Sequence, residues 1–307
     1  MTSNPPLSVV VPLYNEDAGV AQFLSDLKSV LQKIEPRAEI IFIDDGSTDG
    51  TWNVLRGMAS VTPKIQALRL SRRYGKEAAI CAGLEAALGE RVAVMDGDGQ
   101  HPPALLEEML KLSRENGVAI VEAVKKMPFS WRPRLAASRL FNRALSRWMD
   151  IPLHGATDFK LLSRPALEAW RRLPERSPFF RGTSAWIGFT RQSVFFEPPQ
   201  RPGGDSRWTW GALFGLAISA CTAYTAAPLH FLFGIGFAFS LGALLMAAQT
   251  LWMKWNGYAV DGFTTIILLQ LIIGTCIMMG LGVIGLYISR LYEEAKQRPR
   301  YIVMERL

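Results

Sequence analysis

Apolar runs alternate with amphipathic segments through the first 125 residues of the chain. The apolar runs cover residues 7–13, 38–43, 65–70, 91–95 and 118–124. Runs of this length, bounded by turn-forming residues, predict buried strands. Between them apolar residues recur every three or four positions, which predicts helices near residues 20–31, 51–58 and 77–88. Strands that alternate with helices predict an α/β domain with a mostly parallel sheet.

A polar cluster follows directly on each of the first four predicted strands. The clusters are Tyr14-Asn15-Glu16, Asp44-Asp45-Gly46-Ser47, the segment 71–76 and Asp96-Gly97-Asp98. The Asp44 cluster is also typical of a turn with a helix N-cap. Ligands of open parallel sheets bind beyond the carboxyl ends of the strands. We therefore expect these clusters to converge on one cleft.

Asp96-Gly97-Asp98 places two carboxylates one residue apart at the end of a strand. Such a pair can share one hard divalent cation, and carboxylate ligands suit Mg²⁺ or Mn²⁺, which keep places open for phosphate oxygens. An isolated Asp-x-Asp is also a common turn sequence. The metal hypothesis therefore depends on the rest of the chain.

The C-terminal part is strongly apolar. Residues 208–253 and 262–289 contain no Asp, Glu, Lys or Arg. These lengths predict transmembrane helices at about 229–252 and 263–289, and an interfacial helix at 206–227. Arginines and lysines lie before the first span and in the basic tail 290–307. The positive-inside rule then predicts that both ends of the chain are cytoplasmic.

Composition agrees with a basic protein that is partly embedded in a membrane. The formal net charge is +7 and the mean hydropathy is +0.13. Cys81, Cys221 and Cys276 have no metal-ligand spacing and suggest no disulfide framework, which favours a reducing compartment. The first residues do not have the pattern of a signal peptide. We expect no nucleic-acid partner.

Four motifs occur in an order that resembles family 2 glycosyltransferases. They are Pro12-Leu13-Tyr14-Asn15-Glu16, Asp44-Asp45-Gly46-Ser47-x-Asp49-x-Thr51, Gly75-Lys76-Glu77-Ala78-Ala79 and Asp96-Gly97-Asp98-Gly99-Gln100-His101-Pro102-Pro103. More narrowly, the chain resembles the branch that uses polyprenyl phosphate, namely dolichol-phosphate mannosyltransferase and bactoprenol-phosphate glucosyltransferases. The resemblance implies a Rossmann-like GT-A domain over residues 1–205. It also implies a multi-pass protein of the bacterial inner membrane with a cytoplasmic catalytic domain.

The resemblance assigns roles on the donor side of the cleft. It implies that Pro12, Tyr14 and Glu16 surround the nucleobase and ribose, and that Asp45 faces the edge of the base. Asp96 and Asp98 would hold the metal, with Gln100 beside them. Lys76, Gly97 and Lys125 complete the expected donor and phosphate contacts.

The resemblance also assigns roles on the acceptor side. Asp158, in a segment similar to the Asp-Phe-Arg stretch of the family, and Asp98 are the expected catalytic carboxylates. A phosphate acceptor is largely a dianion near neutral pH, so Asp158 is expected to orient the acceptor or stabilise positive charge more than to remove a proton. The arginines Arg181, Arg201 and Arg207 are expected near phosphates. The arginine-rich helix 131–149 is expected to contact lipid headgroups or the acceptor phosphate.

The resemblance implies a metal-dependent, inverting transfer of a sugar from a nucleotide donor to undecaprenyl or another polyprenyl phosphate. UDP-glucose is the first candidate donor, followed by UDP-linked amino sugars and GDP-mannose. Membrane lipids, a flippase and a second copy of the chain are expected partners. A processive polysaccharide synthase is less favoured because the motif Gln-x-x-Arg-Trp is missing. Two alternatives stay open, namely a catalytically silent nucleotide-sugar-binding membrane scaffold and a family 2 transferase that uses another sugar or acceptor. A nucleotidyltransferase is less favoured, because it would need a Gly-rich, basic phosphate loop near the N-terminus, where this chain has Pro12-Leu13-Tyr14-Asn15-Glu16.

Overall fold

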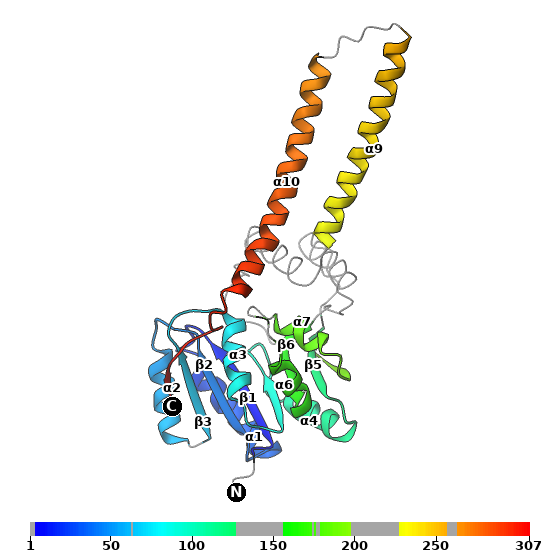
Figure 1. Cartoon of the computed structure of the whole chain (residues 1–307). Helices are drawn as coiled ribbons and strands as arrows, with labels where there is room; N and C mark the ends of the chain where they lie inside the picture. The colour runs from blue at the N-terminus through cyan, green and yellow to red at the C-terminus, as the bar shows by residue number, and fades with distance from the viewer. Residues whose placement is uncertain are drawn as a thin grey trace. The chain divides into compact units, whose positions relative to one another are not determined.

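The computed structural model describes residues 4–62, 64–126, 156–173, 175, 179–197, 227–256 and 263–307 (Figure 1). The chain divides into two compact units. The first contains residues 1–205 together with 298–307, and the second contains residues 206–297.

An eight-stranded sheet forms the centre of the first unit, in the order β7-β5-β6-β4-β1-β2-β3-β8. The strands are β1 (Leu7–Leu13), β2 (Glu39–Asp44), β3 (Ile65–Leu70), β4 (Arg91–Val94), β5 (Ile120–Lys125), β6 (Ala156–Ser163), β7 (Arg191–Phe196) and β8 (Val303–Arg306). Strands β4, β1, β2 and β3 run parallel, as do β5 and β7. β6 is antiparallel to both of its neighbours and β8 is antiparallel to β3. The sheet is therefore mixed, with a parallel centre.

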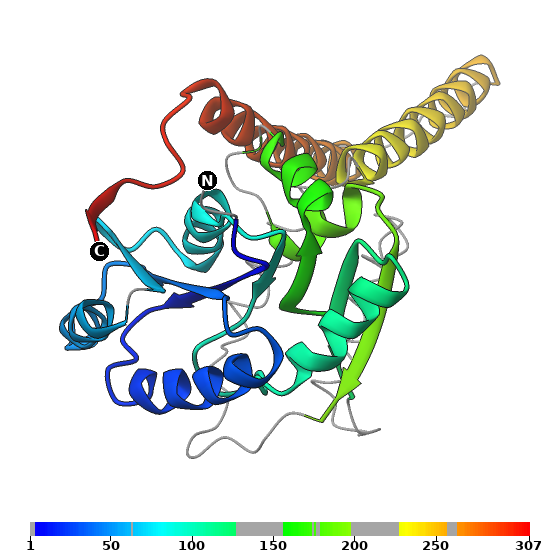
Figure 2. The same cartoon turned by 90° about the horizontal axis from the view of Figure 1, so that it is seen from below.

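Helices pack on both faces of this sheet (Figure 2). They are α1 (Val20–Ile34), α2 (Thr51–Val61), α3 (Lys76–Ala86), α4 (Leu105–Glu115), α6 (Arg164–Arg171) and α7 (Phe180–Trp186). One hydrophobic cluster joins α1, α2 and α4 to Val9 and Val11 of β1. A second joins α3 and α6 to Val10 of the same strand. Successive side chains of a strand point to opposite faces, so an unbroken apolar run is what a sheet covered on both faces requires.

The strands predicted at residues 7–13, 38–43, 65–70, 91–95 and 118–124 are confirmed with small shifts at their ends. Strand β6 was not predicted from the sequence, because polar residues interrupt its apolar pattern. Lys160 of β6 is 1% exposed, and its ammonium group pairs with Glu122 of β5 at 3.0 Å. A buried charge is tolerated when it has such a partner. The pairing explains how a polar sequence forms an interior strand.

The C-terminal residues form the edge strand β8, where the sequence had indicated only a basic tail. Glu305 of β8 accepts hydrogen bonds from Trp52 Nε1 at 3.1 Å and from Arg56 at 2.8 Å. The hydroxyl of Tyr301 donates to Glu85 of α3 at 2.5 Å. These contacts attach the end of the chain to two helices of the first unit.

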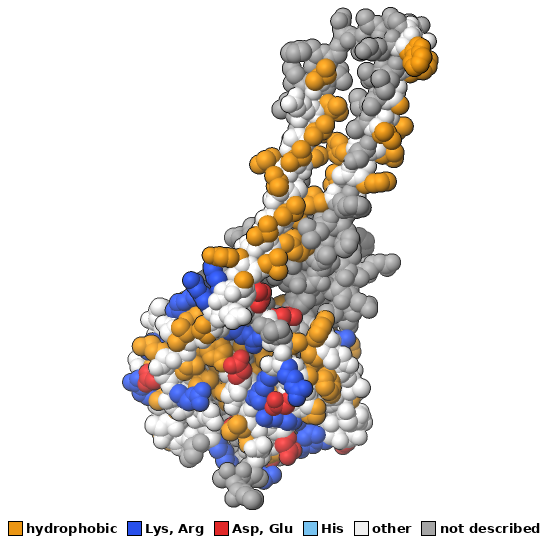
Figure 3. All heavy atoms as spheres, viewed as in Figure 1, with side chains coloured by type: hydrophobic (Ala, Val, Ile, Leu, Met, Phe, Trp, Pro, Cys, Tyr) orange, Lys and Arg blue, Asp and Glu red, His pale blue; other side chains and the backbone are white. Residues whose placement is uncertain are grey.

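The second unit contains two long helices, α9 (Ala227–Trp255) and α10 (Phe263–Ala295). Apolar side chains are exposed along both, as Figure 3 shows, and they include Phe237, Leu244, Leu245, Ile277, Met278 and Leu281. Among the described residues, one helix carries a segment long and apolar enough to cross a membrane, namely Ile272–Ser289 with a mean hydropathy of 2.0. That segment lies within the second predicted span.

Several expectations concern residues outside the described part of the chain. They are the arginine-rich helix 131–149, the interfacial helix up to residue 226, and the phosphate contacts of Arg201 and Arg207. These remain predictions.

Replacing Gly83 by Ala is expected to destabilise the first unit by about 1–3 kcal/mol. A Cβ atom at this position of α3 would lie 2.2 Å from Cγ1 of Val10 and 2.6 Å from Cδ1 of Ile43, in a fully buried layer. Thermal unfolding of the full chain in detergent measures the change. Gly57→Ala in α2 is the control, because nothing lies within 4 Å of its added Cβ. It should raise the stability slightly. Equal stability of both variants would contradict the packing described.

Candidate active site

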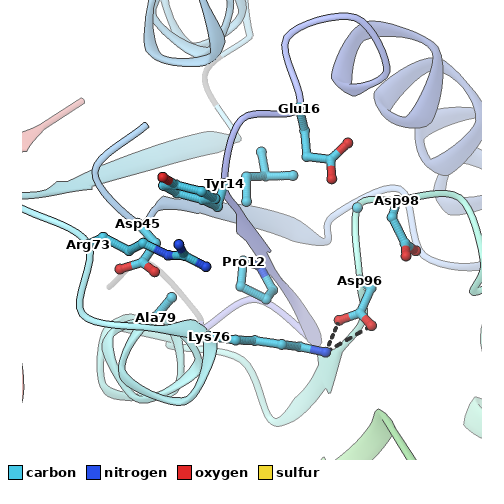
Figure 4. A pocket seen from close by; sticks show the side chains of 11 residues that line it. Pro12, Tyr14, Glu16, Asp45, Arg73, Lys76, Ala79, Asp96 and Asp98 are labelled. Carbon is cyan, nitrogen blue, oxygen red and sulfur yellow. Dashed lines mark hydrogen bonds and ion pairs between the residues drawn. The ribbon is translucent and has the colours of Figure 1, made fainter. Parts of the chain in front are cut away.

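A pocket lies at the carboxyl ends of β1, β2 and β4 (Figure 4). The lining residues all lie in the four motifs or in the polar segment 71–76: Pro12, Leu13, Tyr14, Glu16, Asp45, Arg73, Lys76, Ala79, Asp96, Gly97 and Asp98. Eight of them are expected donor-site residues, and the structure brings these eight together. The four polar clusters thus border one pocket at the strand ends, as the sequence predicts.

Arg73 is a pocket residue that was not singled out from the sequence. Its guanidinium lies over the ring of Tyr14, 4.2 Å from the ring centroid, as Figure 4 illustrates. A guanidinium over an aromatic face is attracted by the ring quadrupole. The position of Arg73 in a polar cluster after β3 was the only signal in the sequence. Arg73 gives the pocket a positive group beside its main aromatic ring.

Asp45 holds the loop that precedes α3. Its two carboxylate oxygens accept the backbone N–H groups of Tyr74 at 2.7 Å and Gly75 at 2.9 Å. Burial raises the pKa of Asp45, while the two N–H groups act in the opposite direction. Each oxygen has a further lone pair, so the group can still accept a hydrogen bond from a ligand. Asp45 thus fixes the loop and borders the pocket.

His101 and Leu13 fix the loop that carries Asp96 and Asp98. The backbone N–H of Asp96 donates to Nδ1 of His101 at 3.0 Å. The imidazole is 2% exposed and stacks on Phe159, with 5.2 Å between ring centroids. Gly97 lies against Leu13, because an added Cβ would be 2.4 Å from its Cδ2. The loop is therefore packed closely at Gly97, where a larger residue would displace Leu13.

Asp98 and Gln100 face each other across the turn. Asp98 accepts the backbone N–H of Gln100 at 3.0 Å and its side-chain amide at 2.8 Å. The amide oxygen of Gln100 accepts a hydrogen bond from Lys125 at 3.2 Å. Lys125 and Gln100 are thus linked to the expected metal-binding carboxylate, although neither lines the pocket itself.

Lys76 connects the donor pocket to Asp158. Its Nζ lies 2.7 and 2.9 Å from the two oxygens of Asp96, and it also donates to Asp158 at 2.5 Å. Burial lowers the pKa of Lys76, but the charges of Asp158 and Asp96 outweigh it, so that the pKa is raised. The lysine remains an ammonium ion between two carboxylates expected to take part in the reaction.

Asp158 is held by cations on two sides. Arg181 forms a two-point contact, with Nε 2.6 Å from Oδ1 and a terminal nitrogen 2.9 Å from Oδ2. Burial alone would raise the pKa of Asp158, but the hydrogen bonds from Arg181 and the charge of Lys76 lower it below its ordinary value. A carboxylate in this state is a weak base. The geometry favours an orienting role for Asp158 over proton removal.

Asp96 and Asp98 have the oxygen donors that a divalent cation would need. Asp96 and Asp98 lie in one loop, border the same pocket and offer hard oxygen donors. Among the described residues, no three His, Cys, Asp or Glu side chains form a group that could hold a metal ion. Mg²⁺ is commonly bound by one or two carboxylates together with substrate phosphates.

A sheet covered on both faces, with an acidic pair beside a pocket at the carboxyl ends of its strands, agrees with the GT-A architecture expected from the motifs. The model of the family "Glycosyl transferase family 2" matches residues 8–170, more than half of the chain, and the chain therefore belongs to this family. The family expected from the motifs and its enzyme class are thereby confirmed.

Relatives match along nearly the whole chain. CsbB of Bacillus subtilis (strain 168), whose name places it among glycosyltransferases, is 36% identical over 97% of this chain and 91% of its own length. "Bactoprenol glucosyl transferase" of Shigella phage SfV is 30% identical over 97% of both chains. Among solved structures, the mannosyltransferase PcManGT from Pyrobaculum calidifontis, in complex with GDP-Man and Mn²⁺, matches with 20% identity and a TM-score of 0.46, covering 91% of this chain and 88% of its own.

Proposed function

We propose that this glycosyltransferase moves a hexose, with glucose from UDP-glucose as the first candidate, onto a polyprenyl phosphate such as undecaprenyl phosphate. The observation that carries the proposal is the joining of two sites through Lys76. One is the donor pocket, and the other is the cationic group around Asp158. The name of the phage relative supports the choice of glucose and of the lipid acceptor.

The donor side has the groups that a nucleoside diphosphate sugar needs. Tyr14 offers an aromatic surface to the base, and Asp45 offers carboxylate oxygens to its N–H groups. Lys76 supplies positive charge to the diphosphate, and Arg73 lies over Tyr14, on the side proposed to bind the base. Asp96 and Asp98, with Gln100 beside them, would hold Mg²⁺ or Mn²⁺, which would stabilise the charge of the departing nucleoside diphosphate.

On the acceptor side, Lys76 and Arg181 supply two cations for a phosphate group. The second pKa of a phosphate monoester is about 6, so near neutral pH the acceptor is already a nucleophilic dianion. An acceptor oxygen bonds to the anomeric carbon as the bond from this carbon to the diphosphate oxygen breaks, and the configuration inverts. Asp158 keeps the two cations in place and needs to remove no proton.

We also propose two membrane spans, at about 229–252 and 263–289, because apolar side chains are exposed along α9 and α10. We propose further that residues 1–205 are the catalytic domain, that both termini are cytoplasmic, and that 206–227 form an interfacial helix. This topology gives the cleft access to cytoplasmic nucleotide sugars. A glycolipid made there requires a flippase before it is used outside.

Metal removal tests the donor half of this proposal. Full-length protein in detergent, treated with EDTA and supplied with undecaprenyl phosphate and a panel of nucleotide sugars, should release nucleoside diphosphate at least about 100-fold more slowly. Adding Mg²⁺ or Mn²⁺ should restore release with one preferred donor, and only when lipid is present. Metal-independent release would contradict the metal site, and lipid-independent release would contradict the acceptor.

A further inference from the structure

Glu77 lies beside the site but has no role in the reaction described so far. It is in the first turn of α3 and directly follows Lys76. Its Oε2 accepts the backbone N–H of Phe180 at 2.8 Å. Phe180 is the first residue of α7, and the next residue is Arg181. One carboxyl group therefore joins the start of α3 to the start of α7.

Two consecutive residues of α3 thus act on the same carboxylate from different sides. Lys76 contacts Asp158 directly. Glu77 accepts a hydrogen bond from the backbone next to Arg181, and Arg181 donates two hydrogen bonds to Asp158. A two-point guanidinium contact requires a defined backbone position, because the planar group must meet both oxygens at once. The contact made by Glu77 fixes the backbone at that point.

We propose that Glu77 is a positioning residue for Arg181, which keeps this guanidinium on Asp158 and ready to receive the phosphate of the acceptor. That Arg181 receives the acceptor phosphate rests on the function proposed above. That Glu77 attaches α7 to α3 does not depend on this function, so the two claims can be tested separately.

The side chain of Glu77 is also a titratable group with a shifted pKa. Burial raises the pKa of Glu77 to about 7, and Asp158 acts in the same direction, while the hydrogen bond from Phe180 and the charges of Arg181 and Lys76 oppose the rise. Cys81, one turn further along α3, also lies within its electrostatic reach. The carbonyl oxygen of a carboxylic acid still accepts an N–H, so the contact survives protonation. Glutamine reproduces the neutral form.

Hydrogen exchange on the full chain in detergent tests the attachment without any substrate. In Glu77→Ala the amides at the start of α7, residues 180–183, should exchange about tenfold faster, the equivalent of one lost hydrogen bond. Glu77→Gln should keep wild-type protection. The control is Glu107→Gln, an exposed glutamate in the first turn of α4, which should change nothing. Unchanged exchange in Glu77→Ala would overturn the proposal.

Kinetics then test the positioning of Arg181. Glu77→Ala should raise the KM for undecaprenyl phosphate about tenfold and leave the KM for the nucleotide sugar within about twofold. Glu77→Gln should restore the acceptor KM. Equal rises in KM for both substrates would indicate a general structural role of Glu77 and would contradict the positioning of Arg181. If the wild type shows no lipid-dependent transfer, the proposed function is wrong. Hydrogen exchange of the amides at the start of α7 then still decides whether Glu77 fixes the backbone next to Arg181.

The pH dependence of stability provides a separate readout. A raised pKa means that the folded state binds the proton more tightly than the unfolded state, whose pKa is about 4.5. The contribution of Glu77 is then most favourable below pH 4.5 and declines as pH rises to about 7. The Tm of Glu77→Gln should exceed that of the wild type at pH 8, and the difference should shrink towards pH 5. A difference independent of pH would contradict this assignment.

Discussion

Replacing Asp98 by Asn is expected to lower kcat/KM for sugar transfer by about 1,000-fold or more. The substitution keeps the size of the side chain and a hydrogen-bond acceptor towards the backbone of Gln100, but it removes one of the two negative charges of the Asp96–Asp98 pair. A divalent cation would lose a charged ligand, and the departing diphosphate would lose the stabilisation that this cation supplies. Steady-state rates with UDP-glucose and undecaprenyl phosphate measure the effect.

A matched variant separates this effect from a general loss of charge. Asp26→Asn changes an exposed aspartate on α1, whose side chain accepts a hydrogen bond from Gln22 one turn earlier, and should leave the rate unchanged. Titration of Mn²⁺ followed by electron paramagnetic resonance adds a direct readout, because Asp98→Asn should weaken metal binding in the presence of UDP. Full activity of Asp98→Asn, or a lost rate with unchanged metal binding, would exclude the proposed metal role.

Asp158→Asn carries the second large expected effect, a loss of about 100-fold in kcat/KM, because the two cations that receive the acceptor phosphate lose the carboxylate that positions them. The substitution leaves Lys76 and Arg181 without the carboxylate that holds them 2.5 and 2.6 Å away. Removing one partner of a fully buried ion pair lowers the free energy of unfolding by about 3–5 kcal/mol. The side chains of Lys76 and Arg181 are 40% and 38% exposed, so solvent reduces this loss of stability to roughly 1–2 kcal/mol.

The pH dependence of transfer distinguishes an orienting carboxylate from a base. Because Lys76 and Arg181 lower the pKa of Asp158, the wild-type rate should follow ionisation of the acceptor phosphate near pH 6 and should show no further dependence from Asp158. Asp158→Asn should reduce the rate at every pH and keep the shape of this profile. A variant profile that rises steadily with hydroxide concentration would instead indicate that Asp158 removes a proton.

The central strands and the pocket could be predicted from the sequence because both depend on local patterns. Mostly apolar runs predict β1 to β4, and the rule that ligands bind at carboxyl ends brings Tyr14, Asp45 and Asp96 together. Composition alone could not show which sugar or metal fits this pocket.

The remaining features depend on contacts between distant residues. Strand β6 could not be predicted because the partner that makes Lys160 acceptable inside the fold is Glu122, 38 residues away. Strand β8 pairs Arg306 with Leu68 across most of the chain, so no local pattern could indicate it. The low pKa of Asp158 results from Lys76 and Arg181, 82 and 23 positions away. Arg73 and Glu77 lie within recognised segments, but their roles depend on Tyr14 and Phe180.

Sugar transfer to polyprenyl phosphate is tested most directly by mass spectrometry of the lipid, after incubation of the full-length protein with undecaprenyl phosphate, UDP-glucose and Mg²⁺ or Mn²⁺. We expect a lipid heavier by one hexose residue, formed in step with UDP and lacking in the Asp98→Asn reaction. Release of UDP with an unchanged lipid, or an unchanged lipid across the whole donor panel, would contradict transfer to polyprenyl phosphate.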